Sequence, residues 1–151
     1  MDKNVVWVNE QKIERTIKAL EKNNMNGYLV QNKEQLLEKI QELTQEGSLV
    51  SCGGSMTLFE TGVIDFLRSG KYKFLDRYEE NLKSEDLKEI YRKTFSADSY
   101  FTSTNAITEN GELYNVDGTG NRVAAMLYGP DKVIVIAGVN KIVKNVDEAI
   151  N

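Results

Sequence analysis

Helical and extended patterns alternate along the chain, and this alternation is the feature that most constrains its fold. Apolar residues recur at three- and four-residue spacing in the helical stretches, whereas the extended stretches are short apolar runs such as VIVIA at residues 133–137. Strands that alternate with helices are typical of a parallel sheet. The sequence therefore predicts an α/β fold with an open, mostly parallel sheet and helices on both faces.

The same patterns give approximate bounds for each element. Helices are predicted over residues 8–24, over a segment that Asn32 caps and that closes near Gly47, over residues 56–70, from a cap at Ser84 to residue 95, and over residues 123–127 and 145–151. Strands are predicted at residues 27–30, 49–52, 73–75, 100–102 and 133–137. Asn110 and Gly111 predict a tight turn between two short extended arms.

Small and polar residues follow the predicted strands at the points where these strands end. The ends are residues 53–55, 76–77, 102–105 and 138–141. Ligands of open parallel sheets bind beyond the carboxyl ends of the strands, which share one edge of the sheet. The sequence therefore predicts a site at this edge, with Asn105 as one of the residues that line it.

The turn SCGGSMT joins a predicted strand to a helix. Gly53, Gly54, Ser55 and Thr57 leave backbone N–H groups free at a helix start, which suits a phosphate or a carboxylate. The alternative is a tight turn in which Ser55 is only a helix cap. The motif is neither the P-loop nor the dinucleotide-binding pattern.

Two carboxylates are candidates for proton transfer or nucleophilic attack. Glu60 lies one turn into the helix after the glycine pair, and Glu109 lies in a polar loop. The alternatives are a solvated helix residue for Glu60 and an exposed hairpin residue for Glu109.

Further polar residues are candidates for ligand binding. Arg122, which forms a cluster with Asp117 and Asn121, suits bidentate binding of a carboxylate or phosphate, or else it holds Asp117 in an internal ion pair. Asn140 and Lys141 follow the last strand, where a lysine binds an anion or is simply exposed.

Absences in the composition exclude several classes of chemistry. The chain of 151 residues has no histidine, which removes Ser-His-Asp and Cys-His catalysis and most zinc chemistry, and no metal site is predicted. Its single cysteine, Cys52, cannot form an internal disulfide or supply an iron–sulfur cluster. A net charge of −4, with no long Lys/Arg cluster, argues against nucleic acid, and no segment is long and apolar enough for a membrane span. These features predict a cytoplasmic protein.

Three strings together resemble the LUD domain of lactate-utilisation proteins. They are GGSMTLFETGV, the long block from Ala97 to Val143, and YKFLD, a predicted strand that precedes this block. The resemblance runs from about Val5 to the last residue, so residues 1–151 are expected to form a single LUD domain. Relatives of this type continue into a cysteine-bearing tail, which is expected to be missing here.

The resemblance implies a fold similar to that of CoA transferases, ribose-5-phosphate isomerase and glucosamine-6-phosphate deaminase. It also implies a role in the oxidation of L-lactate to pyruvate, alongside iron–sulfur partner proteins. The leading hypothesis is a domain that binds a small anionic ligand within such a complex and holds no cofactor alone. Two alternatives remain open: an isomerase or acyl-CoA transferase acting by itself, with Glu109 as the acyl carrier, and a non-catalytic subunit that only docks iron–sulfur proteins.

Overall fold

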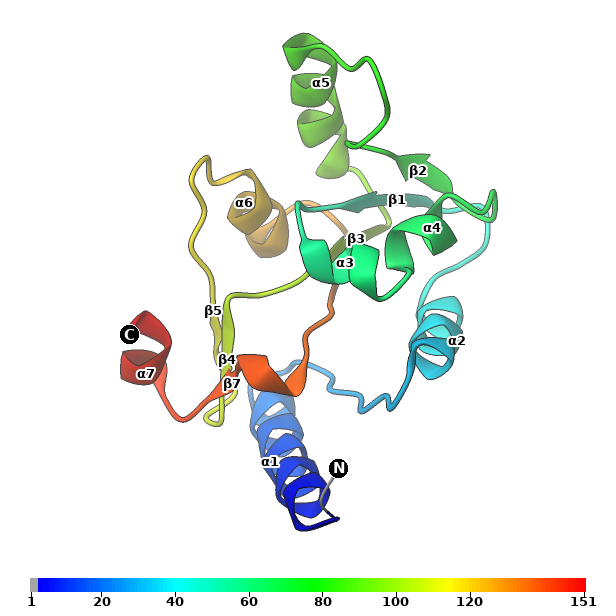
Figure 1. Cartoon of the computed structure of the whole chain (residues 1–151). Coiled ribbons are helices and arrows are strands. Elements are labelled where there is room, and N and C mark those ends of the chain that lie inside the picture. Colours follow the sequence, from blue (N-terminus) through cyan, green and yellow to red (C-terminus); the bar gives the residue numbers. More distant parts are fainter. Residues whose placement is uncertain (1–2) are drawn as a thin grey trace. The chain divides into compact units, whose positions relative to one another are not determined.

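The computed structural model describes residues 3–151, apart from the side chains of residues 4 and 6, and divides the chain into two compact units (Figure 1). The central unit comprises Gln31–Ser103 and Asp117–Ile136. The terminal unit comprises the chain up to Val30, together with Thr104–Val116 and Ala137–Asn151. Each unit is described by itself below.

A four-stranded parallel sheet forms the middle of the central unit. Its strands are β1 (Leu49–Cys52), β2 (Lys73–Leu75), β3 (Ser99–Thr102) and β6 (Lys132–Val135), in the order β2-β1-β3-β6. The register pairs Ser51 with Tyr100 and Tyr100 with Val133. β1 and β3 are the central strands and the most buried, because each has a neighbour on both sides. The predicted parallel α/β sheet is thus confirmed.

Five helices flank this sheet: α2 (Lys33–Leu43), α3 (Met56–Glu60), α4 (Val63–Leu67), α5 (Ser84–Thr94) and α6 (Asn121–Leu127). The chain moves from β1 to β2 in one direction and then back across the sheet to β3 and β6, so right-handed crossovers place α3 and α4 on one face and α5 and α6 on the other. In Figure 1, α4 and α5 lie on opposite sides of β1.

Packing is tight on both faces of the sheet. Leu58, Ile64 and Leu67 are fully buried on α3 and α4 together with Val50 of β1. On the α5 face, the hydroxyls of Ser51 and Thr94 lie 2.6 Å apart and hydrogen-bond. A buried polar pair of this kind costs little because each group satisfies the other.

The terminal unit combines one long helix with a small mixed sheet. Helix α1 (Lys3–Lys22) precedes the strands β4 (Ala106–Thr108), β5 (Leu113–Tyr114) and β7 (Ile142–Val143), in the order β5-β4-β7. The short 3-10 helix η1 (Val139–Lys141) and helix α7 (Val146–Ile150) complete it. β4 and β5 are antiparallel, which confirms the turn predicted at Asn110 and Gly111. Gly111 has φ +83°, a conformation that favours glycine.

Several predicted elements differ from the structure. Residues 27–30 form no strand, because no neighbouring strand pairs with them, and Tyr28 and Leu29 are exposed. The predicted helix over residues 56–70 is two helices, broken at Gly62 with φ +79°. Helix α1 begins at Lys3 rather than at residue 8.

Smaller differences concern element ends. The last central strand ends at Val135 rather than at Ala137, although the Ile136 amide still donates to the Thr102 carbonyl at 2.8 Å. Ser84 is the first residue of α5 rather than its cap; Lys83 holds the cap position, and its amide donates to the Asp86 carboxylate. Within residues 3–151, no helix has the length and the apolar character that a membrane span requires.

Candidate functional site

The order of the central sheet places a topological switch point between β1 and β3. The chain leaves β1 toward β2 on one side, and leaves β3 toward β6 on the other. A crevice forms in such sheets where neighbouring strands diverge in this way, beyond their carboxyl ends. Gly53 and Gly54 follow β1 at this point, and Ser103 follows β3. We call this region the switch-point site.

Gly53 lies against the side chains of the neighbouring strand and of α6. A Cβ atom added to Gly53 would lie 2.6 Å from the Tyr100 hydroxyl, 3.3 Å from Thr102 Oγ1 and 3.3 Å from Arg122 Cγ. Its amide donates to the Phe101 carbonyl at 2.9 Å, which continues the ladder beyond β1. A side chain at position 53 would therefore fill the space in which the Tyr100 hydroxyl lies.

The Tyr100 hydroxyl has no hydrogen-bond partner among the described residues, although the tyrosine is only 3% exposed. The one side-chain oxygen or nitrogen in the described part of the chain that is both unpartnered and sealed from solvent is Ser48 Oγ. Solvent therefore reaches the Tyr100 hydroxyl. Burial raises the pKa of Tyr100 far above its ordinary value, an effect that the nearby Arg77 and Arg122 only partly offset. The hydroxyl therefore stays protonated and available as a donor.

Arg77 brings a positive charge to the other glycine of the turn. A Cβ atom on Gly54 would lie 3.3 Å from Arg77 Nη1. The guanidinium carbon lies 5.4 Å from the ring centre of Tyr78 and 5.3 Å from that of Tyr91, so the group is held between two aromatic rings. Among the described residues no carboxylate forms an ion pair with Arg77. This half-buried guanidinium therefore has unused donors.

The neighbouring carboxylate is engaged elsewhere. Asp76 accepts from Arg68 through both of its oxygens, at 2.7 and 3.2 Å, and Asp76 Oδ1 also accepts from the Tyr78 amide. The Tyr78 hydroxyl in turn accepts from the Ser55 amide at 3.2 Å. These contacts fix the loop after β2 beside the glycine turn.

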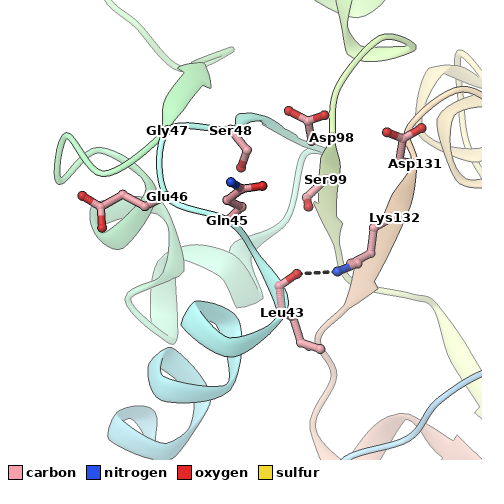
Figure 2. Close-up of a pocket in the computed structure, with 9 residues that line it drawn as sticks. All are labelled: Leu43, Gln45, Glu46, Gly47, Ser48, Asp98, Ser99, Asp131 and Lys132. Carbon is pink, nitrogen blue, oxygen red and sulfur yellow. Dashed lines mark hydrogen bonds between the residues drawn. The ribbon is translucent and has the colours of Figure 1, made fainter.

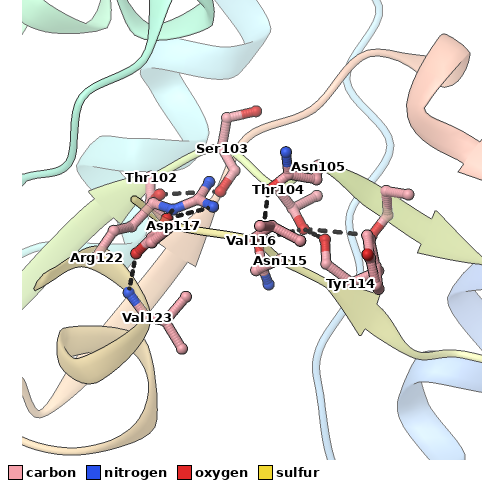
Figure 3. A network of polar contacts seen from close by, with 11 residues as sticks. Thr102, Ser103, Thr104, Asn105, Tyr114, Asn115, Val116, Asp117, Arg122 and Val123 are labelled. Atoms are coloured by element: carbon pink, nitrogen blue, oxygen red, sulfur yellow. Dashed lines mark hydrogen bonds and ion pairs between the residues drawn. The ribbon is translucent and has the colours of Figure 1, made fainter. Parts of the chain in front are cut away.

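Arg122 and Asp117 form an ion pair that is largely buried. The Nε and Nη2 atoms of Arg122 each lie 2.8 Å from Asp117 Oδ1, and Asp117 Oδ2 accepts from the Val123 amide at 2.7 Å (Figure 3). The side chains are 13% and 11% exposed. Of the two predicted roles, the structure contains the internal ion pair. Asn121 is the first residue of α6, directly beside this pair in sequence.

Three predicted residues lie on the short helix after the turn or at its start. Ser55 holds the N-cap position of α3, but its side chain makes no capping hydrogen bond within the described chain. The Thr57 carbonyl accepts from the Thr61 hydroxyl. Glu60, the last residue of α3, is exposed. Helix α3 has only five residues, so it adds little dipole to the site.

Four predicted site residues belong to the terminal unit and are described within it. Asn105 accepts from the Val116 amide at 3.0 Å. Glu109 lies in the hairpin turn and forms an ion pair with Arg15 of α1 at 3.0 Å. Asn140 and Lys141 lie in η1, where the Lys141 amide donates to the Gly138 carbonyl.

Cys52 ends β1 immediately before the glycine turn. Burial raises the pKa of its thiol to about 12, and the opposing effect of the nearby Arg77 is smaller. The thiolate is the reactive form of cysteine, so burial disfavours the reactive form of Cys52 at neutral pH.

Two residues of the switch-point site, Arg77 and Tyr100, are absent from the predicted catalytic and ligand-binding residues, although Arg77 belongs to one of the predicted strand ends. Arg77 lies two residues after the end of β2, and the strand-end rule places it at the predicted edge without assigning it a role. Tyr100 lies inside β3 and became a candidate only through its register with β1, which no local pattern in the sequence reveals.

The structure also has two hollows away from this site. A groove of about 430 Å³ lies at the opposite, amino-terminal edge of the central sheet, lined by residues that include Ser48, Asp98, Asp131 and Lys132 (Figure 2). In the terminal unit, a hollow of about 440 Å³ lies between α1 and the hairpin turn, beside Arg15, Lys18 and Glu109. Neither of these two hollows coincides with the switch-point site.

Comparison with known proteins gives one family. A family profile described as the LUD domain matches residues 13–151, which is nearly the whole chain. No curated protein and no solved structure matches the chain significantly.

Proposed function

This chain belongs to the LUD domain family and is a lactate-utilisation-related protein, and from that premise we propose that it binds a small anionic ligand at the switch-point site. We further propose that it does so as part of a complex that oxidises L-lactate to pyruvate.

The Arg77 guanidinium is the observation that carries the proposal. It is half-buried between two tyrosine rings, it lies next to Gly54, and no described carboxylate pairs with it. A partly desolvated guanidinium gains most from an anionic partner, because charge-assisted hydrogen bonds are about twice as strong as neutral ones. A carboxylate or phosphate that reaches the glycine turn would supply this partner.

Arg122 has a different role in this proposal. Two of its nitrogen atoms already bind Asp117, so it fixes the wall of the site that Gly53 contacts. Arg77, rather than Arg122, is therefore the residue that we assign to the ligand. Removing Arg122 would leave the buried Asp117 charge unpaired, which is strongly destabilising, so Arg77 is also the better residue to test.

The oxidation of lactate to pyruvate releases two electrons and two protons, which need an acceptor. The single cysteine of this chain cannot supply the four thiolates that iron–sulfur clusters usually take. We therefore assign the electron acceptors to iron–sulfur partner proteins and the binding of the anion to this chain.

The proposal is tested by ligand binding to the wild-type chain and to Arg77→Gln. Thermal-shift and calorimetric titrations would use pyruvate, L-lactate, inorganic phosphate and coenzyme A as probes. A probe at a hundred times its Kd stabilises the folded state by about 2.7 kcal/mol, which is a shift of several degrees in Tm. Arg77→Gln should weaken binding about tenfold or more, since it removes a hydrogen bond between charged groups.

Arg92→Gln is the matched control. Arg92 is an exposed arginine in the last turn of α5, in the same unit, and the substitution changes the net charge by the same amount. It should leave binding unchanged. Equal loss in both variants would indicate a nonspecific effect of charge and would contradict the proposed site, as would wild-type affinity in Arg77→Gln.

A further inference from the structure

The Tyr100 hydroxyl is a polar group of the switch-point site that makes no hydrogen bond within the described chain. The Tyr100 side chain is almost fully buried, yet its hydroxyl donates to nothing and accepts from nothing among the described residues. Since solvent reaches this hydroxyl, water is its partner in the free protein, and a ligand oxygen that displaces the water can take over the hydrogen bond.

The position of this hydroxyl fits a ligand contact. Tyr100 and Thr102 lie two residues apart on β3 and therefore point to the same face of the sheet. The hydroxyl lies against Gly53, and the Arg77 guanidinium lies against Gly54. Because these glycines are consecutive, a donor with no charge and a donor with a full positive charge flank the same two-residue turn.

The glycine turn makes the hydroxyl accessible. Any other residue at position 53 would place its Cβ atom 2.6 Å from the hydroxyl oxygen, closer than these atoms can approach. Glycine leaves this space open, and solvent reaches the hydroxyl there. The absence of a side chain at Gly53 thus leaves room for the Tyr100 hydroxyl beside the glycine turn, where the anion is proposed to bind.

We propose that Tyr100 is a specificity-determining residue of the site, whose hydroxyl donates a hydrogen bond directly to the anion that Arg77 binds. The inference rests on the function proposed above. A neutral donor adds no charge, so it does not increase the general attraction for anions. It instead selects ligands that place an oxygen atom at the hydroxyl while another oxygen contacts Arg77.

The test compares Tyr100→Phe with Tyr72→Phe. Tyr72 is also a buried tyrosine of the central unit, but its hydroxyl already hydrogen-bonds to the Thr44 hydroxyl at 2.9 Å. Each variant removes one hydroxyl oxygen from a buried ring. Titrations with pyruvate, L-lactate and inorganic phosphate would give Kd, and thermal denaturation without ligand would give Tm.

The two variants should have opposite effects. Tyr100→Phe should weaken binding of the probe about tenfold or more, because a hydrogen bond to a charged group is lost, while Tm stays the same or rises. Tyr72→Phe should leave Kd unchanged and lower Tm, because it leaves the buried Thr44 hydroxyl with one partner fewer. A Tyr100→Phe variant that binds like the wild type would overturn the inference.

Arg77→Gln separates this inference from the proposed function. If Arg77→Gln weakens binding and Tyr100→Phe does not, the site is correct and the hydroxyl binds only water. If neither variant changes the Kd of a probe that binds the wild type, the ligand lies elsewhere and both proposals are wrong. Absence of binding by the wild type to these three probes and to coenzyme A would also overturn both.

Discussion

Substitution of Gly53 by alanine tests the geometry of the switch-point site without any ligand. The added Cβ would lie 2.6 Å from the Tyr100 hydroxyl oxygen, well inside the contact distance of about 3.3–3.6 Å for carbon and oxygen. Extra atoms forced into a packed region cost about 1–3 kcal/mol. The backbone of Gly53 does not have a positive φ, so alanine itself introduces no backbone strain. The steric clash therefore makes the substitution destabilising.

The expected loss is about 1–2 kcal/mol for Gly53→Ala. Replacing glycine by alanine reduces the conformational entropy of the unfolded chain, which is worth about 0.4–1 kcal/mol and offsets part of the clash. For a chain of this size, each kcal/mol corresponds to a change of about 2–4 °C in Tm. The single variant should therefore melt several degrees below the wild type.

The same substitution should cost much less in a Tyr100→Phe background, since the atom that the Cβ meets is then absent. The remaining neighbours, Thr102 Oγ1 and Arg122 Cγ, lie 3.3 Å away and need to move only slightly. Urea denaturation of the four proteins gives the coupling free energy, which should be about 1 kcal/mol or more. Additive losses, with a coupling within about 0.5 kcal/mol of zero, would refute the placement of the hydroxyl.

Gly54→Ala is the matched control for this cycle. The three atoms nearest to its Cβ would all belong to the Arg77 guanidinium, at 3.3–3.5 Å, which is the far end of a long side chain. We expect a change in the free energy of unfolding within about 0.5 kcal/mol, as for an ordinary surface substitution. A loss as large as that of Gly53→Ala would indicate that any side chain in the turn is disruptive, whatever the position of Tyr100.

Two further predictions concern other parts of the chain. Gly111→Ala should reduce the free energy of unfolding by at least about 3 kcal/mol, because φ is +83° and the Cβ would lie 2.5 Å from the Ala19 carbonyl group. The shift in the midpoint of urea denaturation measures this loss. A loss below about 1 kcal/mol would contradict the turn geometry. Cys52 should react with a thiol reagent at pH 8 only after unfolding, because its pKa is about 12. The stability linked to this thiol is complete below the ordinary thiol pKa and is lost as the pH rises toward 12. Labelling of the native protein at the rate of a free cysteine would show that the thiol is not buried.

Local signals in the sequence were sufficient for most elements of the fold. The helix cap at Asn32 accepts from the Gln35 amide, as its position before an amphipathic helix indicates. The Asn110–Gly111 pair forms the turn of a hairpin. The predicted strand at residues 27–30 failed for a physical reason: an apolar run becomes a strand only where another strand pairs with it. Instead Gly27 packs closely on Ile17 of α1.

The candidate site was only partly predictable, because strand pairing and side-chain packing bring together residues that lie far apart in the sequence. Gly53 and Gly54 are recognisable from their type and position. Tyr100 reaches Gly53 because β1 and β3 pair with Ser51 opposite Tyr100, a register that depends on the packing of the whole sheet. Arg77 reaches Gly54 because two tyrosine rings hold its side chain. Neither contact follows from spacing along the chain.

The size of a hollow is a weaker guide to an anion site than the state of its polar groups. The groove at the amino-terminal edge of the central sheet is lined by three carboxylates, those of Glu46, Asp98 and Asp131, and by one ammonium group, that of Lys132. Lys132 donates to the Leu43 carbonyl, and its single positive charge is outnumbered by the three carboxylates, so the groove disfavours an anion (Figure 2).

The switch-point site has the opposite balance of groups. Its accessible donors are the Arg77 guanidinium, which no described carboxylate engages, and the Tyr100 hydroxyl, which no described group engages. The nearby carboxylates of Asp76 and Asp117 are each neutralised by another arginine. Electrostatics and hydrogen bonding therefore both favour an anion at the glycine turn, even though the two hollows described above lie elsewhere.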